Sequence, residues 1–128
     1  MFTVVDRERI ADRLIQRGRE ASRVDAGAYV GSSEIGGVRW SDIDLAFAVD
    51  DTVPIQTVLD GWTISLLSHS GVVELLHHLV GPVVSRVFLF PRMLQVGLSV
   101  APPAEFMSHG PRFRPLFGLR RWTTPGWA

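Results

Sequence analysis

Cysteine and lysine are both absent from this chain of 128 residues, and each absence excludes a class of site. Without cysteine there are neither disulfide bonds nor thiolate metal centres. All 13 basic residues are arginine, and 13 acidic residues balance them. A chain without net charge has no general positive field, which argues against bulk binding of nucleic acid.

The chain also lacks an uncharged apolar run of the roughly 18 or more residues that a membrane-spanning helix needs. Its first residues, MFTVVDRERI, carry charges where a secretory signal needs an apolar core. We therefore expect a cytoplasmic protein with no membrane partner. The length and a hydrophobic content of 46% suit a single globular domain with a genuine core.

Hydrophobic periodicity predicts an alternation of helices and strands, which is typical of the α/β class. Helices are expected at 6–21 and 54–59. Strands are expected at 28–30, 42–49, 62–67, 83–90 and 93–100. The last two strands should form an antiparallel hairpin. Segment 72–80 fits both a helical and a strand pattern, and its short length between two glycines favours a strand.

Two aspartates carry the strongest indication of chemistry. Asp42 and Asp44 are separated by Ile43 at the start of an alternating segment. On a strand this spacing places both carboxylates on one face and Ile43 on the other. Two like charges this close need a counter-charge. A divalent cation such as Mg²⁺ supplies one, and it completes its coordination shell with phosphate oxygens and water.

Gly31 and Ser32 follow an apolar run and form the other half of the expected site. Glycine lets the backbone approach a phosphate closely, while a serine hydroxyl and successive N–H groups hold its oxygens. Arg39 lies between this turn and the aspartates and is a candidate for contact with a triphosphate, the alternative being an ordinary surface arginine. Together these residues predict a site for Mg²⁺ and ATP or another nucleoside triphosphate.

The elements form one pattern: Val30, Gly31, Ser32, nine intervening residues, then Asp42, Ile43, Asp44 and Leu45. This pattern resembles the signature of the nucleotidyltransferase domains of the DNA polymerase beta superfamily, such as aminoglycoside nucleotidyltransferases. The resemblance implies an α/β (α+β) fold with a mixed β-sheet flanked by helices over residues 1–104. It also implies transfer of a nucleoside monophosphate from a Mg²⁺-bound triphosphate to an acceptor hydroxyl.

The resemblance also assigns roles to residues. Asp42 and Asp44 would be the catalytic residues that hold the metal, and Gly31 and Ser32 would cradle the phosphates. The acceptor would be a small molecule, a partner protein or an RNA end. None of these acceptors is favoured by the residues themselves.

One position departs from the family pattern. The family has a third carboxylate on a neighbouring strand, in a run such as Gln-Val-Asp-Leu. Here the corresponding run is Gln95, Val96, Gly97 and Leu98. Because glycine can neither bind a metal nor accept a proton, we expect transfer to be slower by on the order of 10³-fold. Glu74 is a candidate replacement if its segment pairs beside the hairpin and faces the same side, but an exposed side chain on a half-buried element is the favoured interpretation.

Three alternatives stay open. In the first, the chain is a catalytically degenerate domain that binds a nucleotide or a partner protein. In the second, it is a truncated fragment of a longer nucleotidyltransferase. In the third, a glycine-rich loop leads into an edge strand whose aspartates face water. These alternatives differ in whether any nucleotide is bound.

Two further segments are weaker indications. Glu74, His77 and His78 are residues of metal-binding type, but their order matches none of the zinc-protease motifs, which favours an exposed or partly buried pair of histidines. Residues 105–128 are expected to form an arginine-rich, weakly ordered tail, because proline and glycine interrupt it repeatedly. Its mixture of arginine and aromatic residues leaves contact with nucleic acid as the alternative.

Overall fold

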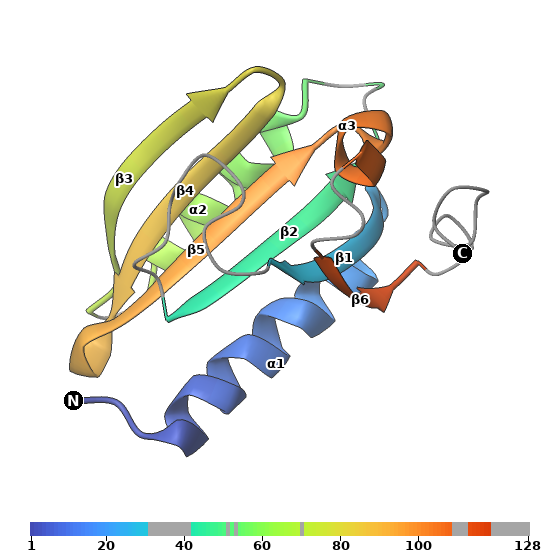
Figure 1. Cartoon of the computed structure of the whole chain (residues 1–128). Helices are drawn as coiled ribbons and strands as arrows, with labels where there is room; N and C mark the ends of the chain where they lie inside the picture. The colour runs from blue at the N-terminus through green and yellow to red at the C-terminus, as the bar shows by residue number, and fades with distance from the viewer. Residues whose placement is uncertain (31–41, 51, 53, 70, 109–112, 119–128) are drawn as a thin grey trace.

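The computed structural model describes residues 1–30, 42–50, 52, 54–69, 71–108 and 113–118 (Figure 1). The helices in this part of the chain are α1 (Val4–Glu20), α2 (Gln56–Leu67) and α3 (Pro103–Ser108). The strands are β1 (Val24–Val30), β2 (Ile43–Val49), β3 (Val73–Val80), β4 (Val83–Phe90), β5 (Leu94–Ala101) and β6 (Phe113–Phe117). None of the described helices is long and apolar enough to span a membrane.

The six strands form one mixed sheet in the order β3-β4-β5-β2-β1-β6. Strands β2 and β5 are parallel, and the other neighbouring strands are antiparallel. The predicted α/β class with a mixed sheet and flanking helices is confirmed. Because β2 lies between β5 and β1, the alternative in which the two aspartates belong to an edge strand is wrong.

Helix α1 begins where the sequence provides a cap. The Thr3 hydroxyl accepts a hydrogen bond from the Asp6 backbone N–H, and the Asp6 carboxylate accepts one from the Thr3 N–H, which makes a capping box. Ala11, Leu14 and Gly18 follow at helical spacing and are buried against the sheet. The helix predicted at 6–21 is therefore present, with slightly different ends.

The two faces of the sheet have different coverings. One face contributes Ile43, Leu45, Phe47 and Val49 of β2, together with the apolar residues of β5, to a core that includes residues of α1 and α2. The opposite face is lined by Ala26, Ala28, Ala46 and Ala48, on which Phe106 of α3 packs. Figure 1 shows α2 behind the strands and α3 in front of them. The small alanine side chains leave the room that Phe106 of α3 occupies.

Segment 62–67, predicted as a strand, is helical, and this prediction is wrong. Helix α2 begins at Gln56 and continues through Gly61 to Leu67. Its buried residues, Leu59, Thr63 and Leu66, recur at helical spacing and face the sheet. The short helix predicted at 54–59 is thus the first half of a longer one.

The remaining strand predictions are mostly confirmed. Segment 72–80 is a strand, β3, and β4 and β5 form the expected antiparallel hairpin. Arg92 and Met93, in the turn between them, have positive φ values of 66° and 68°. Strand β1 begins at Val24, earlier than the predicted 28–30, because its first residues also pair with β2.

The sheet continues past the predicted boundary at residue 104. Strand β6 pairs antiparallel with β1 at the edge of the sheet, and Phe117 is buried with its ring 6.2 Å from that of Phe47. The Arg19 guanidinium lies 5.2 Å from the centre of the Phe117 ring. Residues 113–117 of the predicted tail thus form a strand, and Phe117 packs in the core. Residues 119–128 lie outside the described part.

Candidate functional site

The two predicted metal ligands stand at the beginning of the internal strand β2. Asp42 directly precedes the strand and Asp44 is its second residue, and both side chains are partly exposed. Ile43 and Leu45 point into the core beneath α1 and α2. Because side chains alternate along a strand, Asp44 lies on the opposite face, which it shares with Ala46.

Asp42 is fixed by both neighbouring elements. Its N–H donates to the Gln95 carbonyl at 2.8 Å, and its Oδ2 accepts from the Gln95 N–H at 2.8 Å. The Asp42 carbonyl accepts a hydrogen bond of 3.0 Å from Nε of Arg7 on α1. Asp42 therefore joins the start of β2 to β5 and α1. Its Oδ1 is the oxygen with which it would bind a cation while keeping these contacts.

Gly97 lies directly beside Asp44. In the parallel pairing of β2 with β5, Asp44 is opposite Gly97, and Ala46 is opposite Ser99. Residues that are opposite each other in neighbouring strands direct their side chains to the same face of the sheet. A carboxylate at position 97 would therefore lie on the face of Asp44.

A pair of hydroxyl groups lies on the same face, one step further along the strands. Ser99 of β5 is opposite Ser85 of β4, and their Oγ atoms are 2.8 Å apart in a hydrogen bond. Ser85 was not among the residues that the sequence indicated for this face. The alternation of Gln95, Gly97 and Ser99 along one strand indicated a polar face, but the register that brings Ser85 to it depends on the hairpin.

Gly31, Ser32 and Arg39, the residues expected to hold the triphosphate, lie outside the described residues. Among the residues that are described, no group of three or more histidine or acidic side chains is placed to hold a metal ion. Mg²⁺ commonly takes only one or two carboxylates from a protein and receives its other ligands from phosphate and water. Asp42 and Asp44 are two carboxylates of the kind that such an ion takes from a protein.

Glu74 does not replace the missing carboxylate. Its strand β3 pairs with β4, so β4 separates Glu74 from β5. Glu74 is opposite Phe88, whose buried side chain belongs to the core beneath the helices. Glu74 is therefore exposed on the other face of the sheet from Asp44, which confirms the favoured interpretation over a role as third metal ligand.

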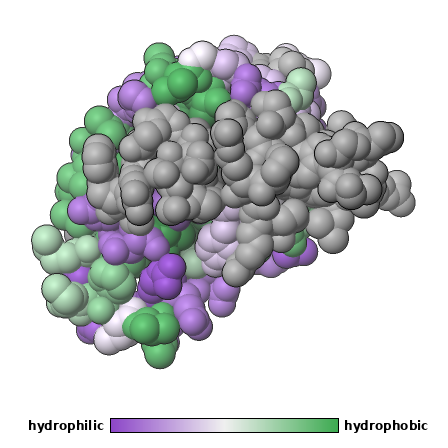
Figure 2. Space-filling view, viewed as in Figure 1, coloured by the Kyte–Doolittle hydropathy of each residue, from purple (hydrophilic) through white to green (hydrophobic). Residues whose placement is uncertain are grey.

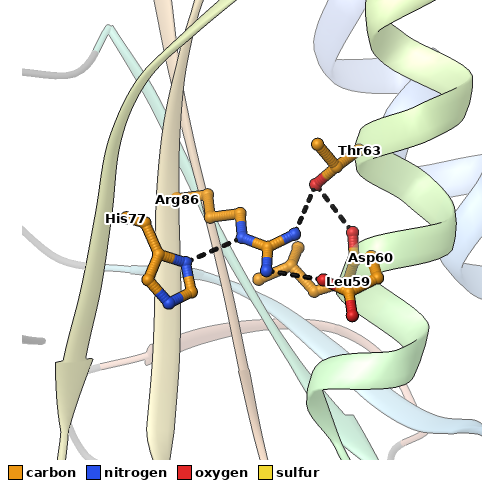
Figure 3. Close-up of polar contacts among 5 residues, drawn as sticks. All are labelled: Leu59, Asp60, Thr63, His77 and Arg86. Atoms are coloured by element: carbon orange, nitrogen blue, oxygen red, sulfur yellow. Dashed lines mark hydrogen bonds and ion pairs between the residues drawn. The ribbon is translucent and has the colours of Figure 1, made fainter.

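A second polar cluster surrounds Arg86 on the face of the sheet that α1 and α2 cover, called the helix-covered face below (Figure 3). Arg86 has 6% of its surface exposed. Its guanidinium donates to Oδ1 of Asp60 at 2.6 Å, to Oγ1 of Thr63 at 2.8 Å and to Nδ1 of His77 at 2.9 Å. The Thr63 hydroxyl donates in turn to the Leu59 carbonyl at 2.8 Å. Each nitrogen of the buried cation therefore has an acceptor, as a buried charge requires.

This cluster was missed in the sequence. Its one signal is an arginine at a core-facing position of the apolar strand VVSRVFLF, which is costly unless acceptors surround it. The acceptors come from α2 and β3, and their approach is not visible in local periodicity. His77 is thus a hydrogen-bond acceptor of Arg86 in this arrangement.

None of the protein-family models matches the chain, and no curated protein matches its sequence. We therefore argue function from the chemistry of Asp42, Asp44 and their neighbours.

Proposed function

We propose that this protein binds a nucleoside triphosphate together with Mg²⁺ through Asp42 and Asp44, and that it is a nucleotidyltransferase-type domain whose transfer rate is low. The observation that carries the proposal is the pairing of Asp44 with Gly97 across parallel strands. In the nucleotidyltransferase family the third carboxylate lies beside the first two, at the position that corresponds to residue 97. The pairing therefore supports the resemblance of this chain to that family. A cytoplasmic location would give the domain access to its nucleotide.

The proposed reaction transfers a nucleoside monophosphate. The oxygen of the acceptor hydroxyl forms a bond to the α-phosphorus, and the bond from that phosphorus to the bridging oxygen breaks. Pyrophosphate leaves with the electron pair, and the hydroxyl proton passes to water. Bound Mg²⁺ would neutralise the negative charge of the triphosphate, and Asp42 and Asp44 would hold the ion.

Gly97 determines the expected rate. Because position 97 is a glycine, it supplies neither a base for the acceptor proton nor a ligand for a second ion. Two-metal sites use that second ion to stabilise the attacking oxygen, so its loss is expected to slow transfer by on the order of 10³-fold. The same observation favours a second candidate function, in which the domain binds the Mg²⁺–nucleotide complex without chemistry.

Calorimetric titration of ATP and GTP, with and without Mg²⁺, tests the binding step. We expect binding that needs Mg²⁺ and that Asp44→Asn abolishes while the fold is kept, because a partly exposed aspartate contributes little to stability. Asp12→Asn is the matched control, since Asp12 is an exposed aspartate on α1. Equal binding in both conditions, or an equal loss in both variants, would remove the basis of the proposal.

Gly97→Asp tests the catalytic step. Three carboxylates without a cation repel one another, so the variant should melt at a lower temperature than the parent protein in chelator and recover when Mg²⁺ is added. Ser99→Asp is the matched control, because it adds the same charge to the same strand face opposite Ala46. A melting temperature of Gly97→Asp that does not respond to Mg²⁺ would contradict the assignment of position 97.

Release of pyrophosphate separates the two candidate functions. Gly97→Asp should raise the release rate by on the order of 10³-fold with an aminoglycoside, a hydroxyl-bearing peptide or an RNA 3′ end as acceptor. Mg²⁺-dependent ATP binding without release, in both the parent and the variant, would instead support binding without chemistry.

A further inference from the structure

Strand β3 is an edge strand with an apolar surface. Within the sheet that the structure describes, β3 pairs with β4 alone. The exposed fractions of its large apolar residues range from 36% to 58%: Val73, Leu75, Leu76, Leu79 and Val80. Figure 2 shows the corresponding green surface along the margin where β3 lies in Figure 1. An edge strand also presents unpaired backbone N–H and C=O groups to any further strand.

The usual protections of an edge are mostly missing from β3. Natural edges are commonly blocked by lysine, by proline or by charged side chains. Strand β3, VELLHHLV, has neither lysine, arginine nor proline, and Glu74 is its one acidic residue. Its one irregularity is a bulge, because Glu74 is opposite Phe88 while Leu76 is opposite Val87. Leu75 is therefore the extra residue.

The bulge gives β3 a self-complementary pattern. Glu74 is opposite Phe88 and His77 is opposite Arg86, so Glu74 and His77 share the helix-covered face although they are three positions apart. Val73 and His78 share the other face. Consider two copies of β3 that run antiparallel, with Glu74 of one copy opposite His77 of the other. Val73 is then opposite His78 of the other copy. In both pairs the two residues lie on the same face of the sheet. A two-fold axis repeats each pair, as a symmetric dimer requires.

We propose that a second copy of this chain pairs with the edge of β3 in this antiparallel register, which joins the two sheets into one. The Arg86 cluster prepares the contact chemically. Because Arg86 Nε donates to Nδ1 of His77, a neutral His77 carries its proton on Nε2. That N–H is the donor for the Glu74 carboxylate of the second copy. Asp60 and Thr63 hold Arg86, so they position His77 indirectly.

Sedimentation equilibrium of the full chain tests the dimer. We expect a mass of twice 14.2 kDa at high concentration and dissociation on dilution. Val73→Lys should shift the protein to the monomer, because it places a charge in the paired edge. Val4→Lys, at an exposed valine of α1, is the matched control and should leave the dimer unchanged. A monomer at every concentration, or a dimer that Val73→Lys does not weaken, would overturn the proposal.

Disulfide cross-linking tests the register, and the natural absence of cysteine makes the result unambiguous. The double variant Val73→Cys/His78→Cys should form a covalent dimer under oxidising conditions, since the two positions are opposite each other across the two-fold axis. Val73→Cys/His77→Cys, whose positions lie on different faces, should cross-link much less. Equal cross-linking of the two variants would show that another register or another surface joins the copies. Neither variant alters Asp42 or Asp44, so nucleotide binding tests the proposed function separately.

Discussion

Strands β2 and β3 begin alike and have opposite surroundings. β2 reads IDLAFAV and β3 reads VELLHHLV, each with an acidic second residue in an apolar strand. β2 has a neighbour on both sides and helices on both faces, and most of its residues are buried. β3 has one neighbour and remains largely exposed. Similar apolar patterns thus produce a buried core strand in one place and an exposed edge strand in another.

The acidic second residues of the two strands also have different surroundings. Asp44 lies beside Gly97 on the face that carries Ser85 and Ser99, where the proposed Mg²⁺ would bind. Glu74 lies at the edge, on the face of Arg86, where a second copy of the chain would supply a donor. The position of the strand in the sheet therefore decides which kind of partner each carboxylate is suited to.

The largest expected difference between the two strands is in packing. Phe47 of β2 is fully buried, with the Trp62 ring edge-on at 4.9 Å. Phe47→Ala should lower the free energy of unfolding by about 3–5 kcal/mol, through lost apolar burial and a cavity. Leu79→Ala on β3 should cost less than about 1 kcal/mol in the monomer, because Leu79 is largely exposed. Urea denaturation of dilute protein measures both, and similar losses would break the contrast.

Two helix glycines sharpen the comparison between centre and surface. Gly18 of α1 faces Phe47, and a Cβ there would overlap the phenylalanine ring, whereas a Cβ at Gly61 of α2 would meet nothing within 4 Å. Gly18→Ala should therefore destabilise the protein by about 1–3 kcal/mol despite the better helix propensity of alanine. Gly61→Ala should stabilise it by about 0.5–1 kcal/mol. Opposite shifts in thermal melting are expected, and shifts of the same sign would count against this packing.

Two ion pairs between described residues provide a third test. Asp60 joins the buried Arg86, while Asp6 joins Arg92, whose side chain is 63% exposed. Asp60→Ala should cost about 1–2 kcal/mol, since it leaves a buried cation with fewer acceptors while the exposure of Asp60 itself limits the loss. Arg92→Ala should cost no more than about 0.5 kcal/mol. Added salt should abolish the second loss and leave most of the first, as denaturation in low and high salt would show.

The smallest expected effect concerns acid. Hydrogen bonding from the Thr3 backbone lowers the pKa of Asp6 below its usual value, and the Arg92 charge lowers it further. Because the folded pKa is below the unfolded one, the stabilisation is present above the unfolded pKa and is lost as pH falls through the folded pKa. In the parent protein, this small contribution to the melting temperature should be lost as the pH falls to about 4 and below, the usual range of an aspartate. The Asp6→Asn variant should lack the contribution at every pH, so its melting temperature should depend less on acid. Identical pH profiles of parent and variant would contradict this role.

The local elements could largely be predicted from the sequence, because each depends on short-range geometry. The spacing of Ile10, Leu14 and Ile15 predicts the apolar face of α1, and all three pack against the core. The alternation after Asp42 predicts β2. The apolar residues at 62–67 misled the prediction, since a short apolar run fits a strand as well as the second half of a helix. Packing of Leu59, Thr63 and Leu66 against the sheet decided for the helix.

The sequence by itself determined the acidic pair, the absence of thiolate chemistry and the glycine at position 97. Only the tertiary structure decided that Gly97 is beside Asp44, that Arg86 collects acceptors from α2 and β3, and that β3 lies at an edge. The physical reason is the range of the forces involved. Backbone geometry fixes the direction of a side chain within a few residues, whereas strand order and register are chosen by burial and pairing between segments that are distant in the sequence.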